Sequence, residues 1–250
     1  METPMNVDQS ALIQELAPTG RLRAALNFGN QVLVQRADDG SAKGITPALA
    51  MELGRRLGLE VDFVPYKRAE DVFETRNDGV WDVCFLANEP VRAAEIAFTA
   101  PYVSIAGVYA VPQVSPFSDL ASVDKPGVRI GVGKGSAYDL FLTRTLKQVE
   151  FVRIESATGI PALLIEGKAD VAAGIRQPME EFIASTPGYR ILAEPFMEIK
   201  QAMALPNGRR LAADYLKRFV EDVKASGFVR DVLDRNGQKD VAVAPPVSVA

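Results

Sequence analysis

The sequence of 250 residues contains no histidine and a single cysteine, Cys84. One cysteine excludes a disulfide within one chain, and zinc, haem and iron–sulfur sites lose their usual ligands. Nucleophilic catalysis by serine–histidine or cysteine–histidine pairs is excluded for the same reason. Cys84 lies in an apolar run, where a small buried side chain is the expected role. We therefore expect no metal and no cofactor.

The chain also lacks a cluster of basic residues and a long apolar run. A net charge of −4 and a pI near 5.1 argue against a nucleic-acid partner, which needs a concentrated basic surface. No stretch reaches the roughly 18 apolar residues of a membrane span, and the first 20 residues lack the basic start and apolar core of a secretory signal. As written, we expect a cytoplasmic monomer, and a periplasmic protein if the sequence is a trimmed mature form.

Apolar periodicity and turn residues predict an α/β fold with two lobes. Leu49, Leu53 and Leu57 recur at the spacing of one helix face, and Gly58 is typical of a helix end. Alternating strands and helices imply mostly parallel sheets flanked by helices. The predicted elements of the first block are strands 20–27, 61–64 and 81–87 and helix 44–59. Those of the second block are strands 127–132, 150–154 and 169–175 and helices from 136 and over 159–166.

Two apolar β-rich segments, 102–112 and 200–206, are predicted to cross between the lobes. We expect lobe one to contain 1–105 and 205–250, and lobe two to contain 106–204. A helix is predicted over 209–236, with Leu211, Tyr215, Phe219 and Val223 on its apolar face. The final segment, VAVAPPVSVA, is expected to be extended or loosely tethered.

Arg92 follows the predicted strand 81–87 and precedes Pro101-Tyr102. An arginine in a polar stretch is more often a solvated surface charge. This one lies just past the carboxyl end of a buried strand, where open α/β sheets bind ligands. A guanidinium offers a planar fork of donors that fits a carboxylate. Arg92 is therefore a candidate for binding a carboxylate.

A second candidate site is GKGS, Gly133–Ser136, between a predicted strand and a predicted helix. A helix N-terminus favours an anion through its unpaired N–H groups and its partial positive charge. We expect the backbone N–H groups of this turn to be free, and Ser136 to be either an N-cap or a ligand donor, roles that are compatible. The spacing is not that of a Walker phosphate loop.

These segments together resemble the type II periplasmic solute-binding proteins, specifically the bacterial family 3 group that binds polar amino acids and related solutes. The resemblance extends from Gly20 to about Gly237. It rests on GRLRAAL, GITPALAMELGRRLGL, DGVWD, PVRAAEIAFTAPY, GVRIGVGKGSAYD and LLIEGKADVAAG, which occur in the family's order. It implies a protein that clamps a carboxylate-bearing solute, amino-acid-like or dicarboxylate, between two lobes, with an ABC transporter permease as a partner. It also implies a protein that is not an enzyme and has no catalytic residue.

The resemblance also implies the roles of individual residues. Arg92 matches the arginine that binds the ligand's carboxylate, Ser136 matches a hydroxyl donor to the same group, and Phe28 matches an aromatic residue that packs on the ligand. Asn88 is expected to replace a serine or threonine contact. The full expected set of ligand-binding residues is Asn27, Phe28, Asn88, Glu89, Arg92, Gly135, Ser136, Ala137, Arg176 and Gln177.

The chain departs from the family where an acid normally receives the ligand's ammonium. Five residues after Asp170 stands Ile175, followed by Arg176. A buried ammonium without a counter-charge costs several kcal/mol. A second cation near the site favours an anionic solute, although Arg176 is equally a surface residue, and Glu89 or Glu181 is an alternative acceptor for an amine.

Two other functions stay open. The same fold hosts a dehydratase of the cyclohexadienyl type, whose acidic catalytic residue corresponds to Pro178 here, with Glu180 and Glu181 nearby. A sensor or regulatory subunit is the third possibility, because a chain without an export signal does not present solutes to a transporter.

Overall fold

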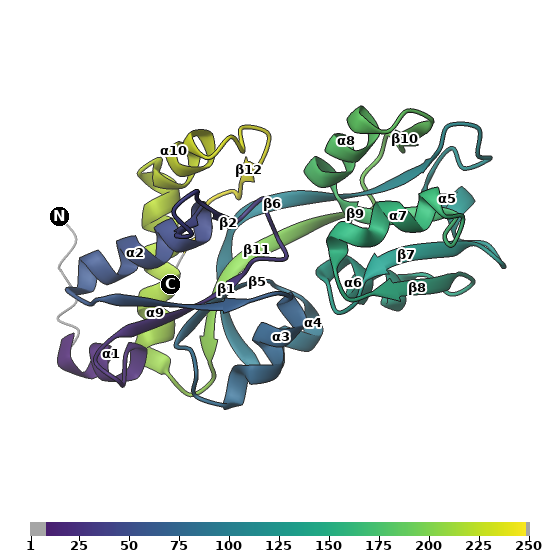
Figure 1. Ribbon diagram of the computed structural model, residues 1–250. Coiled ribbons are helices and arrows are strands. Elements are labelled where there is room, and N and C mark those ends of the chain that lie inside the picture. The colour runs from purple at the N-terminus through teal and green to yellow at the C-terminus, as the bar shows by residue number, and fades with distance from the viewer. Residues whose placement is uncertain (1–8, 249–250) are drawn as a thin grey trace. The chain divides into compact units, whose positions relative to one another are not determined.

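The computed structural model describes residues 9–248 (Figure 1). Residues 1–8 of the segment assessed for a signal, and residues 249–250 of the expected tail, lie outside this description. The described chain divides into two compact units. Unit 1 contains the chain up to Tyr66, Asp71–Val103 and the chain from Gln201 onward, and unit 2 contains Lys67–Glu70 and Ser104–Lys200.

Unit 1 contains a mixed sheet whose strands follow the order β4-β1-β5-β11-β6. β1 pairs in parallel with β4 and with β5, whereas β11 pairs antiparallel with β5. The strands of unit 1 are β1 (Leu22–Asn27), β4 (Val61–Tyr66), β5 (Val83–Ala87) and β12 (Ala242–Val243), with a separate small sheet of β2 (Gln35–Arg36) and β3 (Ala42–Lys43). Two strands, β6 (Ile96–Pro112) and β11 (Met197–Pro206), contribute residues to both units.

The helices of unit 1 cover its sheet with apolar faces. In α2 the predicted residues Leu49, Leu53 and Leu57 are buried, and each contributes about 1.5 to 3 kcal/mol. Gly58 ends α2 in the left-handed conformation, with φ at 68°. The helices of unit 1 are α1 (Gln9–Leu16), α2 (Ile45–Leu57), α4 (Pro90–Ala93), α9 (Arg210–Ala225) and α10 (Phe228–Arg235), with a 3₁₀ turn at Thr75–Asn77. The helix α3 (Ala69–Glu74) contributes residues to both units.

Unit 2 has the strand order β6-β9-β7-β8, and β10 pairs with β6. β7 is parallel to both β8 and β9, and β9 is antiparallel to β6. The elements of unit 2 are α5 (Leu120–Val123), β7 (Arg129–Gly133), α6 (Ala137–Thr145), β8 (Glu150–Ile154), α7 (Ile160–Ile165), β9 (Val171–Ile175), α8 (Arg176–Ser185) and β10 (Tyr189–Ile191), with a 3₁₀ turn at Ala157–Gly159. The expected α/β class is therefore confirmed.

The predicted helix over 209–236 is wrong in two respects. Gly227, with φ at 80°, separates α9 from α10. Phe219 and Val223 are buried as predicted, but the buried face of α9 also includes Leu216 and Val220, and Leu211 is 38% exposed. A helix advances about 100° per residue, so a strict four-residue spacing drifts about 40° at each step and leaves the core.

The tail is extended but not loosely tethered within the residues described. β12 pairs with β6, and the backbone N–H of Ala244 donates to Tyr102 O. Lys224 Nζ, buried in α9, donates to Pro245 O at 3.0 Å, and the backbone N–H of Val247 donates to the Glu221 carboxylate at 3.0 Å. These bonds hold the tail against unit 1, so the expectation of loose tethering is wrong.

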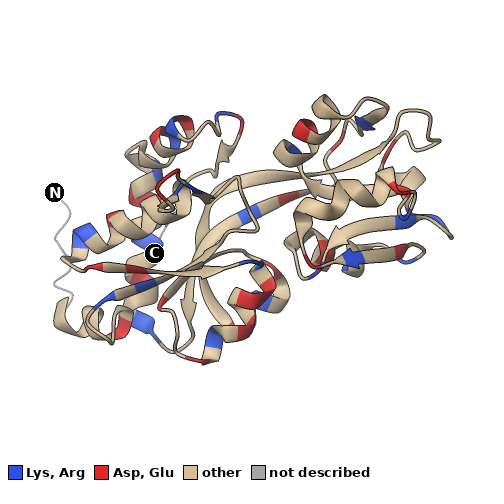
Figure 2. Cartoon of the chain, in the orientation of Figure 1, with Lys and Arg blue, Asp and Glu red and all other residues tan. Residues whose placement is uncertain are grey.

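Charged residues of both signs are interspersed along the elements of each unit (Figure 2). Cations and anions alternate on helices such as α9, which carries Arg210, Asp214, Lys217 and Asp222. No helix within residues 9–248 has the length and apolar character needed to cross a membrane.

Candidate functional site

The expected ligand-binding residues of unit 1 gather at one edge of its sheet. β1 and β5 are parallel neighbours, with Ala24 opposite Val83 and Ala25 opposite Cys84. Their carboxyl ends therefore lie at the same edge, which we call the unit 1 edge. Asn27 and Phe28 stand at the end of β1, and Asn88, Glu89 and Arg92 follow β5.

Arg92 is buried, with 2% of its surface exposed, and lies in the short helix α4. Pro90 opens this helix, and the backbone N–H of Arg92 donates to Glu89 O at 2.9 Å. Arg92 Nη1 donates to Ala87 O at 3.3 Å, which directs the guanidinium to the end of β5. Its positive charge opposes the effect of burial, which raises the pKa of the Cys84 thiol in β5. Arg92 is thus not a solvated surface charge.

The other expected residues of the unit 1 edge differ in exposure. Asn27 Oδ1 accepts a hydrogen bond from the backbone N–H of Gly29 at 3.0 Å, which shapes the turn after β1. The ring of Phe28 is half-buried and packs under the Arg36 guanidinium, 4.4 Å from its centre. Asn88 is exposed, whereas Glu89 is 5% exposed. The edge therefore contains one buried cation and one buried acid.

Asn30, which the sequence did not suggest, also lies in the loop after β1. Its residue surface is 7% exposed, and its Oδ1 atom is buried without a hydrogen-bond partner within the described part of the chain. Buried polar atoms normally find a partner, so an unpartnered one requires an explanation such as a bound ligand. The only signal in the sequence was a second asparagine in the Asn-Phe-Gly-Asn turn after the first strand.

The expected residues of unit 2 gather at the corresponding edge of its sheet. β7 and β9 are parallel neighbours, with Ile130 opposite Val171. Their carboxyl ends lead into α6 and α8, so the first turns of these two helices share what we call the unit 2 edge. The expected residues there are Gly135, Ser136, Ala137, Arg176 and Gln177.

The expectation of free N–H groups in the GKGS turn is wrong for three of its residues. The backbone N–H of Lys134 donates to Ile154 O, and that of Ser136 donates to Gly133 O. The Gly135 N–H donates to the carboxylate of Asp139 at 3.0 Å. Asp139 is buried, and Arg153 Nε lies 3.0 Å from its Oδ1 atom. An internal carboxylate, already paired, therefore occupies the anion-favouring position at the start of α6.

Ser136 is the N-cap of α6 and keeps its own proton for another acceptor. Its Oγ accepts a hydrogen bond from the backbone N–H of Asp139 at 3.1 Å. The neighbouring Tyr138 hydroxyl interacts with Ser136 and Gly133, and burial raises the pKa of Tyr138 to about 12. The Ser136 O–H can donate to this phenol or to a carboxylate, and the carboxylate is the stronger acceptor.

Gly135 has a conformation and surroundings that exclude a side chain. Its φ is 65°, which L residues rarely adopt. A Cβ at this position would lie 2.7 Å from Glu70 Cβ, which also belongs to unit 2. The turn before α6 thus requires glycine for both backbone and steric reasons.

Arg176 and Gln177 occupy the first turn of α8, a helix that was not predicted. Arg176 is half-exposed, and its Nη1 atom lies 3.4 Å from Glu180 Oε1 one turn along the helix. Gln177 Oε1 is buried and has no hydrogen-bond partner among residues 9–248. The cation is therefore already paired within α8, while the amide oxygen is not.

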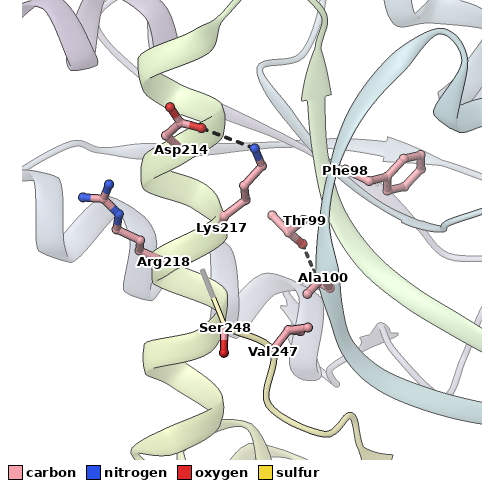
Figure 3. A pocket seen from close by; sticks show the side chains of 8 residues that line it. All are labelled: Phe98, Thr99, Ala100, Asp214, Lys217, Arg218, Val247 and Ser248. Carbon is pink, nitrogen blue, oxygen red and sulfur yellow. Dashed lines mark hydrogen bonds and ion pairs between the residues drawn. The ribbon is translucent and has the colours of Figure 1, made fainter. Parts of the chain in front are cut away.

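A surface pocket of unit 1 lies away from these residues, between α9 and the first residues of β6 (Figure 3). Lys217 Nζ lies 3.3 Å from Asp214 Oδ1 on its wall. Its lining contains none of the expected ligand-binding residues: it consists of Phe98, Thr99, Ala100, Asp214, Lys217, Arg218, Val247 and Ser248.

The chain has the two-lobed α/β fold of solved periplasmic binding proteins. The chain belongs to the bacterial extracellular solute-binding proteins, family 3, which its sequence matches over residues 33–238. This confirms the family that the sequence resembles. No curated protein matches the chain.

Solved structures show the same fold at low sequence identity. The cysteine-binding protein from Campylobacter jejuni is 18% identical, with a TM-score of 0.78 over 94% of this chain and 99% of that one. A putative ABC transporter binding component from Wolinella succinogenes, complexed with lysine, is 17% identical, with a TM-score of 0.75 over 87% and 95%. An ancestral amino-acid-binding protein, a precursor of cyclohexadienyl dehydratase, is also 17% identical, with a TM-score of 0.75 over 89% and 97%.

Proposed function

We propose that the protein binds a small carboxylate-bearing solute, with Arg92 as the principal partner of the carboxylate and Ser136 as a second donor. The observation that carries this proposal is the burial of Arg92, which has 2% of its surface exposed at the unit 1 edge. Burying a guanidinium costs several kcal/mol unless paired and hydrogen-bonded groups offset the cost. Membership of a solute-binding family supports a ligand as one such group.

The chemistry of the two side chains fits one carboxylate. The Arg92 guanidinium offers parallel N–H donors, and the Ser136 hydroxyl supplies a third donor from the N-terminus of α6. We propose that the two lobes clamp the solute by hinge closure, as in other two-lobed binding proteins. Binding then requires no chemical step.

The test is a thermal-shift screen of carboxylates, amino acids and dicarboxylates, followed by calorimetry of the solutes that bind. A ligand raises the melting temperature because it binds only the folded state. Arg92→Ala should weaken binding at least tenfold, since hydrogen bonds to charged groups contribute about 1.5 to 3 kcal/mol. The affinity of Arg92→Lys should lie between those of the wild type and Arg92→Ala, because lysine keeps the charge but not the planar fork of donors.

The matched control is Arg55→Ala, which removes an exposed arginine of unit 1 whose ion-pair partner among the described residues is Glu52 of the same helix. It should leave binding unchanged. A ligand whose affinity is equal for the wild type and Arg92→Ala would overturn the proposal.

Delivery to an ABC transporter is the favoured use of this binding, because a structural neighbour is a putative transporter component. Its test is a pull-down of a transporter permease that depends on ligand. A sensory role predicts instead a ligand-dependent association with a signalling protein.

A dehydratase is the second candidate, since another structural neighbour is a precursor of such an enzyme. Glu181 is exposed on α8, and Pro178 stands where the catalytic acid was expected. Incubation with prephenate and arogenate should give no product. Product formation that Glu181→Gln abolishes would replace the binding-only function with catalysis.

A further inference from the structure

The unit 2 edge presents a neutral acceptor, Gln177, two residues after Ile175, which stands where the family resemblance implies an acid. Gln177 lies in the first turn of α8, and its Oε1 is a buried atom without a hydrogen-bond partner in the described residues. The first turn of α8 contains no acidic residue, and Ile175 precedes it. An unpartnered buried acceptor destabilises the folded chain, and a hydrogen-bond donor of a ligand would remove this cost.

The surroundings of Gln177 disfavour a positively charged donor. The N-terminus of α8 carries a partial positive charge, and the adjacent Arg176 is a cation whose partner is Glu180, one turn away. An ammonium placed against a neutral amide in this environment would lose its water without gaining a counter-charge. An uncharged donor avoids this cost.

A hydroxyl group fits Gln177 in either orientation of its amide. If Oε1 faces the ligand the hydroxyl donates, and if the amide is rotated the hydroxyl accepts from Nε2. An ammonium, which only donates, fits one orientation alone. A hydroxyl is therefore the ligand group with the best match to this position.

The unit 1 edge shows the same chemistry independently. Asn30 Oδ1 is also a buried amide oxygen without a partner among residues 9–248. Glu89 is the buried acid of that edge and therefore the competing acceptor for an ammonium. Asn30 Oδ1 and Gln177 Oε1 are both uncharged, whereas the Glu70 carboxylate beside Gly135 is paired with Arg68 and Lys134.

We infer that Gln177 determines which solutes the protein accepts, by hydrogen bonding to an uncharged hydroxyl of a 2-hydroxycarboxylate in place of the ammonium of an amino acid. This inference rests on the proposed function, because Arg92 and Ser136 must hold the carboxylate. It assigns a specificity role to Gln177 and a substrate class to the site.

The experiment measures calorimetric affinities for pairs of acids that differ only in the 2-substituent. The probes are lactate and alanine, 2-hydroxy-4-methylpentanoate and leucine, and malate and aspartate. The wild type should bind the hydroxy member of at least one pair at least tenfold more tightly than the amino member. Gln177→Glu should reverse this preference, because its carboxylate provides the counter-charge that an ammonium needs.

Two further variants separate specificity from folding. Gln177→Met, similar in size but without the amide, should lose about tenfold in affinity for the hydroxy acid at an unchanged melting temperature. Gln148→Glu, the same change at an exposed glutamine of unit 2 outside the proposed site, is the matched control and should leave the ratio of the two affinities unchanged.

Each outcome decides one of the two proposals. Equal wild-type affinities for the two members of every pair, or a preference for the amino acid, would overturn the inference alone. Loss of such a preference in Glu89→Gln would show that Glu89 receives the ammonium. An unchanged affinity ratio in Gln177→Glu would also overturn it and leave carboxylate binding intact. If no carboxylate of any pair binds the wild type, the proposed function fails and the inference fails with it.

Discussion

Each unit contains an arginine on one strand that forms an ion pair with an aspartate at the start of the neighbouring parallel strand. In unit 1 Arg23 of β1 binds Asp82, which immediately precedes β5, with Nη2 and Oδ1 2.8 Å apart. In unit 2 Arg129 of β7 binds Asp170, which immediately precedes β9, also at 2.8 Å. In both pairs the backbone N–H of the arginine donates to the same carboxylate. The same Arg–Asp pair between two parallel strands thus occurs twice in one chain.

The two pairs differ in burial and in their additional partners. The Asp82 side chain is fully buried and has a second cation, Arg209, at 3.2 Å. The Asp170 side chain is 34% exposed. Because a buried charge depends entirely on its partners whereas an exposed one is solvated by water, the unit 1 pair should matter far more to stability. The comparison predicts that burial, rather than hydrogen-bond geometry, sets how much each ion pair contributes to the free energy of unfolding.

The largest expected effect comes from Asp82→Ala. This change leaves Arg23 and Arg209 without their shared anion and should lower the free energy of unfolding of unit 1 by about 3 to 5 kcal/mol. Trp81, the only tryptophan, is 1% exposed and reports on unit 1. Its fluorescence transition in urea should move to a lower midpoint.

The control for this variant is Asp62→Ala, which breaks an exposed pair with Arg21. It should leave the fluorescence midpoint unchanged. Equal shifts in the two variants would contradict the importance of burial.

Gly135→Ala should be the next largest effect. The positive φ and the contact with Glu70 Cβ should together destabilise unit 2 by about 2 to 3 kcal/mol. Gly58→Ala in unit 1 is the matched control, since its φ is 68° but no atom lies within 4 Å of the added Cβ. Its cost should be about 1 kcal/mol. The unfolding transition followed by circular dichroism should shift in both variants. The transition followed by Trp81 fluorescence should shift more in Gly58→Ala.

Asp170→Ala should lower the free energy of unfolding by less than Asp82→Ala or Gly135→Ala. After discounting for solvent screening of a partly exposed pair, the expected loss is about 1 kcal/mol in unit 2. The circular dichroism transition should shift while the Trp81 transition stays in place. A shift as large as that of Asp82→Ala would remove the distinction between the two pairs.

The smallest effect is a pH dependence in the acid range. Hydrogen bonds from Arg129 hold the pKa of Asp170 below its usual value. A depressed carboxyl pKa contributes stability that is complete above the unfolded pKa of about 3.9 and is lost as the pH falls through the folded pKa. The difference in stability between the wild type and Asp170→Asn should therefore shrink as the pH falls below about 4. A difference that stays constant down to pH 2 would contradict this assignment.

The sequence predicted the elements whose signals are local. Strand 150–154 coincides with β8, and the helix with Leu49, Leu53 and Leu57 coincides with α2 and its glycine end. The Arg–Asp pairs also had a signal, because a glycine precedes each aspartate by three residues, at Gly79 and Gly167, before a strand.

Contacts that depend on tertiary structure could not be predicted from the sequence. The bond from the Gly135 N–H to Asp139 depends on how α6 begins, and the pairing of Asp139 with Arg153 joins α6 to β8. Gln177 was expected at the site, but its unpartnered oxygen becomes visible only once α8 is in place. The residues proposed to contact the ligand remain predictions.

Because of the order of segments along the chain, the two units are completed at different times during synthesis. All of unit 2 has been made once Lys200 has left the ribosome, whereas unit 1 still lacks the residues from Gln201 onward. Those residues include the part of β11 that pairs with β5, Gln201 opposite Ala87, and Arg209, which pairs with Asp82. Unit 2 can therefore mature while unit 1 is incomplete, although β1 emerges long before any strand of unit 2.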